Sequence, residues 1–370
     1  MEMMSLEECC EILDSMRIPI TASNRKEGIY PYYGANGIQD HVADYIFDDE
    51  LVLLAEDGGN FGSKTRPIAY RVSGKCWVNN HAHVLKPKEG LNVDFLCYSL
   101  MFYNTEGLVN GATRQKLTQT TMRKMLIPNL SIENQLYIVN QLNKLLKIIE
   151  LRKKEIQQLD NLTKARFVEL FGDAIHNDKG WENDTVEKLC KEIYGGGTPS
   201  KSHPEYYEDG DIPWVSSKDM KTDVLTDSQI KINQLGVDNS TARMIPINSV
   251  IMVIRSGILK HTLPVAINAV PITVNQDLKV FIPNERVLTR FLAIQFKMHE
   301  KDILSGVRAV TADNIEFNSL KHRELIVPPI ELQQEYVTFL EQIDKSKVAV
   351  QKALDETQIL FDSLMQKYFG

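Results

Sequence analysis

The strongest pattern of apolar and polar positions runs through two stretches of roughly 40 residues, 131–172 and 329–370. Apolar side chains recur in both at three- and four-residue spacing, and each stretch closes with Phe-Gly, a common helix stop. The apolar stripes comprise Leu142, Leu146, Ile149 and Ile156 in the first stretch, and Leu340, Ile343, Val350, Leu354, Phe361 and Leu364 in the second, which Lys347 and Thr357 interrupt. The spacing predicts two long amphipathic helices.

Such a stripe is unstable in water unless another surface covers it. The obvious cover for each helix is the other one, so we predict a two-helix coiled coil. Leu142, Leu146 and Ile149 are expected to face Ile343, Val350 and Leu354. The alternative is that each helix packs on its own domain.

The rest of the chain is typical of short strands and turns. The apolar run Leu51–Ala55 and the alternation in Cys76–Leu85 predict strands, separated by turns at 57–60 and 73–75. Short helices are expected at Leu91–Tyr103 and Leu288–Met298. We therefore predict an α/β (α+β) chain with globular domains at 1–130 and 182–328, long helices at 131–172 and 329–370, and a linker at 173–181.

Matching segments recur in the same order in both halves. Glu50–Gly58 matches Ser249–Gly257 with an offset of 249 − 50 = 199, and Trp77–Val84 matches Thr273–Val280 with an offset of 196. The second half carries an insertion that holds the Gly-rich Gly195–Ser200. The loop after the first matched strand should be three residues longer in the first half, since the offset falls from 199 to 196. The chain is thus a fused pseudo-dimer, which predicts two related binding places.

Composition excludes several classes of protein. The net charge of −7 argues against coating of nucleic acid by bulk electrostatics, although basic residues gathered on one face would still bind it. No apolar run has the length of a membrane span. Five cysteines without C-x-x-C spacing are typical of free thiols in a reducing compartment, so a cytoplasmic location is expected.

Three segments are distinctive: Tyr194–Ser200 (Tyr-Gly-Gly-Gly-Thr-Pro-Ser), Ile212–Asp219, and Asn275-Gln276-Asp277-Leu278. The first half has the variant forms Tyr32–Ile38 and Trp77–His83. With the repeated module of proline, long helix and Phe-Gly, these segments resemble the specificity (S) subunits of type I restriction-modification systems over the whole chain.

The resemblance implies two target-recognition domains separated by two antiparallel helices. Each domain would bind one half of a split site in double-stranded DNA, and the helices would dock two methyltransferase (M) subunits, which restriction (R) subunits join. The chain would be non-catalytic and need no cofactor or metal. S-adenosylmethionine would belong to the M subunit, and ATP and Mg to the R subunit, while adenine-N6 methylation and DNA cleavage would be the partners' reactions.

Two domains that bind different half-sites should differ where they contact bases and agree where they hold the fold or a phosphate. The best candidates for base contacts are the loops that differ between the halves, 56–66 and 255–261, together with 214–218. Arg114 and Arg308 follow matching turns, which suggests phosphate contacts or structural ion pairs. Candidate DNA-binding residues are Lys64, Arg66, Asn79, Asn80, Arg114, Lys116, Lys201, Trp214, Ser216, Ser217, Lys218, Arg255, Lys260 and Arg308.

Other functions remain as alternatives. Gly58–Thr65 is close to a phosphate-binding loop, but Ser63 replaces a required glycine and the next residues predict a turn and a strand instead of a helix. His81 and His83 could share one strand face as metal ligands, yet their counterparts Asp277 and Lys279 would not bind the same metal. A coiled-coil scaffold without DNA contact, or an unrecognised nuclease, is the alternative to DNA recognition.

Overall fold

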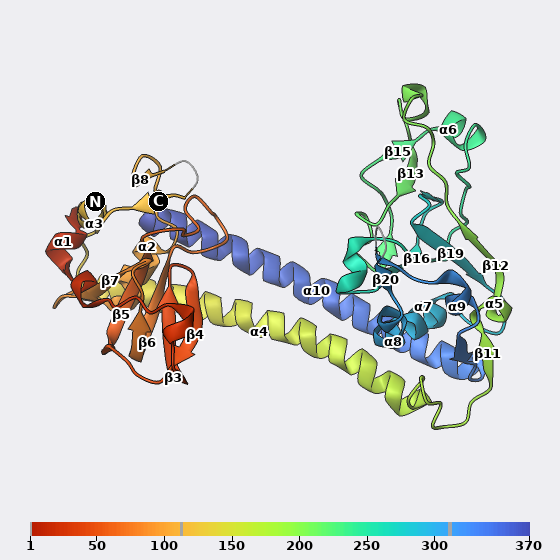
Figure 1. Ribbon diagram of the computed structural model, residues 1–370, viewed down its shortest axis with the longest axis horizontal. Helices are drawn as coiled ribbons and strands as arrows, with labels where there is room; N and C mark the ends of the chain where they lie inside the picture. Colours follow the sequence, from red (N-terminus) through yellow and green to blue (C-terminus); the bar gives the residue numbers. More distant parts are fainter. Residues whose placement is uncertain (1, 112–113, 310–312) are drawn as a thin grey trace. The chain divides into compact units, whose positions relative to one another are not determined.

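The computed structural model describes residues 2–111, 114–309 and 313–370, and they form two compact units (Figure 1). Unit 1 comprises Met1–Glu155 with Val350–Gly370, and unit 2 comprises Ile156–Ala349. Each unit contains one sheet-rich domain and one end of both long helices, α4 (Ile132–Phe171) and α10 (Ile330–Phe369). The predicted mixed fold of two sheet-rich domains with long helices is confirmed.

Unit 1 is built on a six-stranded sheet in the order β2-β7-β5-β6-β3-β4. All neighbours are antiparallel except β3 and β6. Helix α2 packs against β5 and β6, and its N-cap Asn92 accepts hydrogen bonds from two backbone amides of the first turn. The elements are β1 (Met3–Ser5), α1 (Leu6–Cys9), β2 (Cys10–Ile12), η1 (Asp14–Met16), η2 (Ala22–Asn24), β3 (Glu27–Gly34), β4 (Gly37–Val42), β5 (Phe47–Ala55), β6 (Ala69–Val78), β7 (Ala82–Pro87), α2 (Val93–Met101), β8 (Val109–Asn110), β9 (Lys116–Leu117), α3 (Gln119–Arg123) and β10 (Leu126–Pro128).

Unit 2 contains a five-stranded sheet, β12-β19-β16-β17-β14, and a three-stranded sheet, β15-β13-β18. Helix α7 packs against β16, β17 and β19, as α2 does in unit 1. The elements are β11 (Asn183–Thr185), α5 (Val186–Leu189), β12 (Cys190–Gly195), η3 (Pro204–Tyr206), β13 (Ile212–Val215), β14 (Val224–Leu225), β15 (Lys231–Ile232), α6 (Gln234–Asp238), β16 (Val250–Val253), η4 (Gly257–Lys260), β17 (Val265–Asn268), β18 (Thr273–Val274), β19 (Leu278–Pro283), α7 (Thr289–Met298), α8 (Glu300–Ser305), β20 (Arg308–Ala309), β21 (Asp313–Asn314), α9 (Phe317–Lys321) and β22 (Glu324–Ile326).

Strand pairing corrects the alignment of the two halves. Leu54 pairs with His83 in unit 1, and Met252 pairs with Lys279 in unit 2. His83 and Lys279 keep the predicted offset of 279 − 83 = 196, so their strand partners Leu54 and Met252 are also counterparts. The offset along β5 and β16 is therefore 252 − 54 = 198, and the predicted offset of 199 is wrong by one residue. A slip of one residue moves side chains to the opposite face of a sheet. Asp57 is therefore the counterpart of Arg255.

Strand structure within Cys76–Leu85 is confirmed, but it belongs to two strands, since β6 ends at Val78 and β7 begins at Ala82. The turn expected at 73–75 is wrong, because Gly74 lies inside β6 opposite Asp49. Its φ of +75° is tolerated there because glycine lacks a Cβ.

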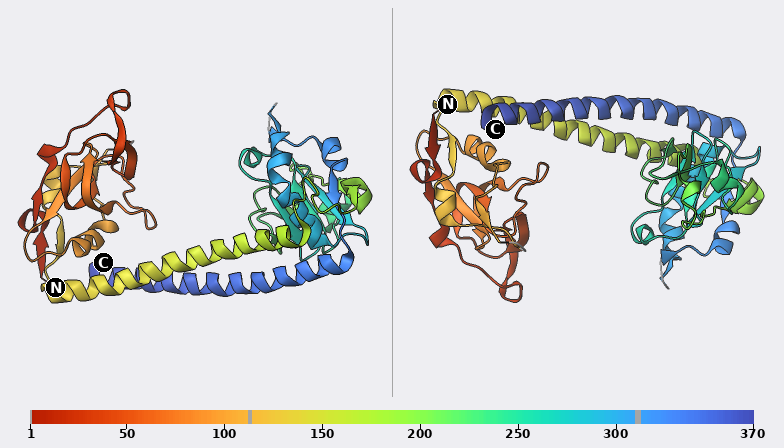
Figure 2. Two further views of the ribbon diagram at one scale, coloured as in Figure 1. Left: turned by 90° about the horizontal axis from the view of Figure 1, so that it is seen from below. Right: turned by 90° about the horizontal axis from the view of Figure 1, so that it is seen from above.

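The two long helices run antiparallel within each unit (Figure 2). In unit 2, Tyr336 donates its hydroxyl hydrogen to the Thr163 carbonyl at 3.0 Å, and Phe167 and Phe171 pack on its ring. Gly172, with φ +75°, follows the end of α4 as the sequence predicts. In unit 1, Tyr98 hydrogen-bonds Asn143 of α4 and packs edge-on against Phe361 of α10.

The expected facing of the stripes is partly wrong. Leu142 belongs to unit 1 and Ile343 to unit 2, so these residues lie in different halves of the helix pair. The side chain of Leu146 is 37 % exposed, and Leu145 takes the inward position between Leu142 and Ile149. Most of the other expected seam residues are buried: Leu142, Ile149, Leu340, Ile343, Leu354 and Phe361. Three are half-buried: Ile156, Val350 and Leu364.

Both polar interruptions of the α10 seam meet a polar residue of α4. Lys347 lies 2.5 Å from the Asp160 carboxylate in unit 2. In unit 1, the Arg152 guanidinium donates to the Thr357 hydroxyl and to the Ala353 carbonyl. These contacts satisfy groups that would otherwise be costly to bury beside an apolar stripe.

A buried glutamine ties the start of each long helix to its domain. Gln135 accepts from the Asn92 amide at 2.8 Å and donates to the Gly90 and Leu130 carbonyls. Gln333 makes the same three bonds to the Leu288 amide and to the Arg286 and Pro328 carbonyls. Both side chains are almost fully buried. Apolar periodicity does not single out these two polar residues, although their separation of 198 residues matches the repeat.

Candidate nucleic-acid interface

Three turns of unit 1 meet at one end of its sheet: the loop 56–67 after β5, the turn 79–81 between β6 and β7, and the hairpin of β8 and β9. The backbone amides of Glu56 and Asp57 donate to the His81 carbonyl at 2.9 and 3.3 Å. The Gly58 amide donates to the Gln115 carbonyl at 3.1 Å. We call this group of turns the first tip.

Unit 2 reproduces the arrangement with the loop 254–263, the turn 275–277 and the hairpin of β20 and β21. The amides of Ile254 and Arg255 donate to the Asp277 carbonyl at 2.9 and 3.2 Å, and the Ser256 amide donates to Asp313 at 3.1 Å. We call this group the second tip. The loop of the first tip is only two residues longer, 12 against 10, which corrects the expected difference of three.

The same backbone carries chemically different side chains in the two tips. Asp57 in the first tip corresponds to Arg255 in the second, and His81 corresponds to Asp277. In the first tip the Asp57 carboxylate lies 2.5 Å from Nε of Arg114, which comes from the loop of the β8–β9 hairpin. In the second tip Arg255 Nε donates to Asp277 Oδ1 at 2.6 Å. Equivalent scaffolds thus present different chemical surfaces.

The hairpins correct another predicted match. Asn110 pairs with Lys116 in unit 1, and Arg308 pairs with Asn314 in unit 2. Isolated bridges join Asp57 to Lys116 and Arg255 to Asn314. Arg308 therefore corresponds to Asn110, and the expected match of Arg308 with Arg114 is wrong. The side chain of Arg308 lies outside the described residues.

The candidate residues whose side chains are described fall into three groups by exposure. Those with exposed side chains are Lys64, Arg66, Asn80, Arg114, Lys116, Lys201, Lys218, Arg255 and Lys260. Ser216 and Ser217 are half-buried, and Asn79 and Trp214 are buried. Asn79 accepts from the His81 amide and donates to Gln39, while Trp214 donates to the Gly197 carbonyl at 2.9 Å. These two side chains shape the turns instead of facing solvent.

The distinctive motifs converge on the second tip. The Asn275 amide donates to the Val215 carbonyl at 3.0 Å, and Thr198 hydrogen-bonds Gln276. In unit 1 the equivalent bond runs from the Asn79 amide to the Tyr33 carbonyl at 3.0 Å. Tyr32-Tyr33-Gly34 is therefore the counterpart of Trp214-Val215-Ser216. The motifs build the base of each tip.

A family model described as type I restriction modification DNA specificity domain matches residues 1–161 and 178–357. The chain belongs to this family. The resemblance inferred from the motifs is confirmed, and the two tips belong to a DNA specificity subunit.

Individual relatives agree with the family. A specificity subunit of a type I restriction enzyme from Escherichia coli is 29 % identical over 328 residues, covering 87 % of this chain and 76 % of the relative. A putative one from Haemophilus influenzae is 28 % identical over 362 residues, covering 92 % and 86 %. The S subunit structure from M. genitalium has a TM-score of 0.62 at 14 % identity, covering 100 % of this chain and 96 % of that one, and supports the fold.

A buried ion network lies beneath the first tip of this specificity subunit. His83 Nδ1 is 2.6 Å from the Asp14 carboxylate and Nε2 is 2.9 Å from the Leu117 carbonyl. Both partners carry acceptor oxygens, so the ring is held in place at both of its nitrogens. Burial acts to raise the pKa of Asp14, but the hydrogen bond and charge of His83, with the Val84 amide and Arg17, outweigh it and the pKa lies below its usual value.

Glu56 completes this network. Burial acts to raise its pKa, but the hydrogen bond from Arg17 and the charge of His83 hold the pKa below its usual value. Asp14, Glu56 and His83 offer ligand atoms within 4.8 Å of one another, as a metal site would. However, the Arg17 guanidinium lies 2.6 Å from Glu56 and 3.3 Å from Asp14. A cation already bridges the carboxylates, so the donor set does not fit a metal.

Unit 2 has a basic side chain at the place equivalent to His83. Lys279, the counterpart of His83, lies 4.6 Å from the centroid of the Phe317 ring, and burial lowers its pKa. His83, which is buried, and Lys279, which is half-buried, thus support the tips from beneath. His81 is partly exposed and lies 3.4 Å from Arg114 at the surface.

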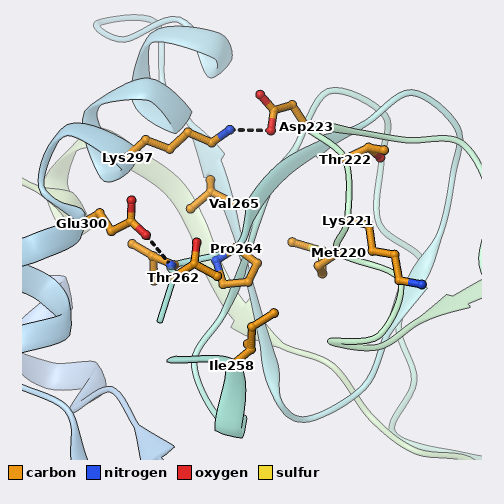
Figure 3. Close-up of a pocket in the computed structure, with 11 residues that line it drawn as sticks. Met220, Lys221, Thr222, Asp223, Ile258, Thr262, Pro264, Val265, Lys297 and Glu300 are labelled. Atoms are coloured by element: carbon orange, nitrogen blue, oxygen red, sulfur yellow. Dashed lines mark hydrogen bonds and ion pairs between the residues drawn. The ribbon is translucent and has the colours of Figure 1, made fainter. Parts of the chain in front are cut away.

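A pocket of about 320 Å³ in unit 2 is lined partly by Ile258 and Thr262 of the second-tip loop and partly by residues outside the tip (Figure 3). Three of its charged groups already have partners: Lys297 pairs with Asp223 at 2.5 Å, and Glu300 accepts from the Leu263 amide at 2.7 Å. It offers no set of catalytic groups. In the described part of the chain, no helix combines the length and apolar character required to cross a membrane.

Proposed function

We propose that the first and second tips each bind one half of a bipartite site in double-stranded DNA. The observation that carries this proposal is the repetition of one backbone scaffold with different side chains. Matched amide-to-carbonyl bonds hold both tips, whereas Asp57 and His81 are replaced by Arg255 and Asp277. Two readers of different half-sites need a common support and different base contacts.

The chain acts as the targeting subunit and its partners perform the chemistry. Two methyltransferase subunits dock on the helix pair and bind S-adenosylmethionine, and restriction subunits with ATP and Mg join them. Adenine-N6 methylation and cleavage are then directed to the site that the tips select. The exposed apolar side chains Leu146, Ile148 and Leu151 on α4 support docking on this helix.

Methylome sequencing of cells that express the chain with its methyltransferase tests the proposal. We expect adenine methylation at a bipartite motif that requires both proteins. The purified chain alone should neither methylate nor cut DNA, and methylation or metal-dependent cleavage by it would contradict the targeting role.

A charge-matched pair of variants tests the tips. Arg255→Ala with Lys260→Ala should weaken binding of DNA that carries the half-site of unit 2. The control, Lys153→Ala with Lys154→Ala, removes the same charge from exposed positions of α4. Equal losses in the tip variant and the control, at one salt concentration, would overturn the assignment of the tips.

A further inference from the structure

Each tip presents one exposed guanidinium that a carboxylate holds in place. Arg114 is 59 % exposed and Arg255 is 48 % exposed, whereas the Asp57 and Asp277 side chains that hold them are 20 % and 24 % exposed. The carboxylate comes from the strand end in unit 1 and from the β18–β19 turn in unit 2. The same pair is thus built twice with its members on different elements.

Among the described residues, the bonds of Arg255 leave one edge of its guanidinium without a partner. Nε and Nη2 both approach Asp277 Oδ1, at 2.6 and 2.5 Å. Asp277 is fixed in turn, because its Oδ2 accepts from the Asn275 side chain at 3.1 Å and its amide donates to Asn275 Oδ1 at 3.1 Å. The edge formed by Nη1 and Nη2 therefore points away from the carboxylate with its orientation set.

A guanidinium edge held in this way matches guanine. Two parallel N–H donors fit O6 and N7 of guanine in the major groove, and this is the commonest specific contact between proteins and DNA. Lys260 lacks such an edge, and its ammonium is 3.9 Å from Asp313, too far for a hydrogen bond. It is better suited to a phosphate.

We infer that Arg114 and Arg255 each contact a guanine, one in each half-site, and that Asp57 and Asp277 are positioning residues. A half-exposed ion pair contributes little to stability, so its orienting effect is the larger consequence. This inference rests on the proposed binding of DNA by the tips, and adds the base and the pairs of residues that select it.

The experiment is methylome sequencing of cells that express the full chain with its methyltransferase. It compares wild type with the second-tip variants Arg255→Lys, Asp277→Asn and Asp277→Glu, and with the first-tip variants Arg114→Lys and Asp57→Asn. Arg255→Lys should relax selection at one G·C pair of one half-site by roughly 10- to 100-fold. Asp277→Asn should relax the same pair, and Asp277→Glu should restore part of it. Arg114→Lys and Asp57→Asn should relax one G·C pair in the other half-site.

The unaltered half-site is the internal control for folding, because each variant changes one tip only. Arg290→Lys is the matched control: Arg290 of α7 is also held by a carboxylate, Asp344, but lies outside the tips. The inference is overturned if Arg255→Lys lowers methylation equally at all sequences, if Asp277→Asn changes no base preference, or if the relaxed pair is A·T. Absence of any bipartite motif for wild type would instead overturn the proposed function.

Discussion

The ammonium nitrogen of Lys347 lies 2.5 Å from a carboxylate oxygen of Asp160, across the helix pair of unit 2. In unit 1 the corresponding polar contact joins Arg152 to Thr357. A polar residue in a coiled-coil seam favours one register, because every other register leaves it without its partner. Two contacts of this kind therefore fix how α4 and α10 are paired.

Exchanging the charges of Lys347 and Asp160 should test their pairing. Lys347→Asp alone places two carboxylates together and should destabilise unit 2, while adding Asp160→Lys should restore part of the loss. Because the Asp160 side chain is 47 % exposed, we expect a coupling free energy of at most about 1 kcal/mol. Denaturant unfolding of the two single variants and the double variant measures it, and additive losses would show no interaction.

Lengthening both helices together should change the spacer in the DNA site. One heptad inserted in α4 between Arg152 and Asp160, with one in α10 between Lys347 and Thr357, preserves both polar contacts. Seven residues add about 10 Å, or roughly three base pairs. Methylome sequencing should find both half-sites unchanged and the spacer longer.

The matched control inserts the heptad in α4 alone. Its seam then pairs out of register, so thermal unfolding should occur at a lower temperature than in the double insertion. A double insertion that alters the bases recognised and keeps the spacer would refute control of spacing by the helices.

His299 should make unit 2 sensitive to acid. Burial and, to a smaller extent, the charge of Arg323 together lower the pKa of its imidazole to about 4, and Nε2 has no partner among the described residues. In the unfolded chain His299 binds a proton below about pH 6.5, whereas in the folded unit it binds one only near pH 4. Between these two pH values, the stability of unit 2 therefore falls as the pH falls. The difference corresponds to about 3 kcal/mol.

Replacing this histidine should remove the effect. His299→Gln should flatten the fall in stability between pH 6.5 and 4, measured by denaturant unfolding at each pH. His322→Gln is the control, because the His322 side chain is 70 % exposed. A wild-type profile in His299→Gln would show that another group causes the pH dependence.

The two buried glutamines should stabilise the starts of the long helices equally. Gln135→Leu or Gln333→Leu leaves one amide and two carbonyls without their partner, and should cost about 2–4 kcal/mol. Gln334→Leu is the control, because Gln334 is exposed and neighbours Gln333. Thermal unfolding should occur at a clearly lower temperature in Gln135→Leu and Gln333→Leu than in Gln334→Leu. An equally small decrease in all three variants would contradict the structural role of the buried glutamines.

Periodic features could be predicted from the sequence, whereas contacts across the sheet could not. The helices follow from local spacing, and both contain 40 residues in the structure. The apolar pattern predicts that Leu146 faces the other helix, because it does not distinguish Leu146 from its neighbour Leu145. Only packing selects the inward side chain.

The sequence alignment of the first tip with the second tip is wrong by one residue for a similar reason. Gly58 and Gly257 look equivalent in sequence, but strand pairing makes Ser256 the counterpart of Gly58. The Asp57–Arg114 pair joins residues on separate turns, and no local pattern links them. The charge reversal at Asp57 and Arg255 becomes visible only when backbone bonds define which positions correspond.

Unit 2 occupies one uninterrupted stretch, Ile156–Ala349, and unit 1 is assembled from the chain on both sides of it. In the gene, two recombination crossovers could replace that stretch as a cassette. Crossovers in the codons between Arg152 and Asp160 and between Lys347 and Thr357 would leave each polar contact with its original partner. A lineage could thus acquire a new half-site in a single exchange while inheriting the other unaltered.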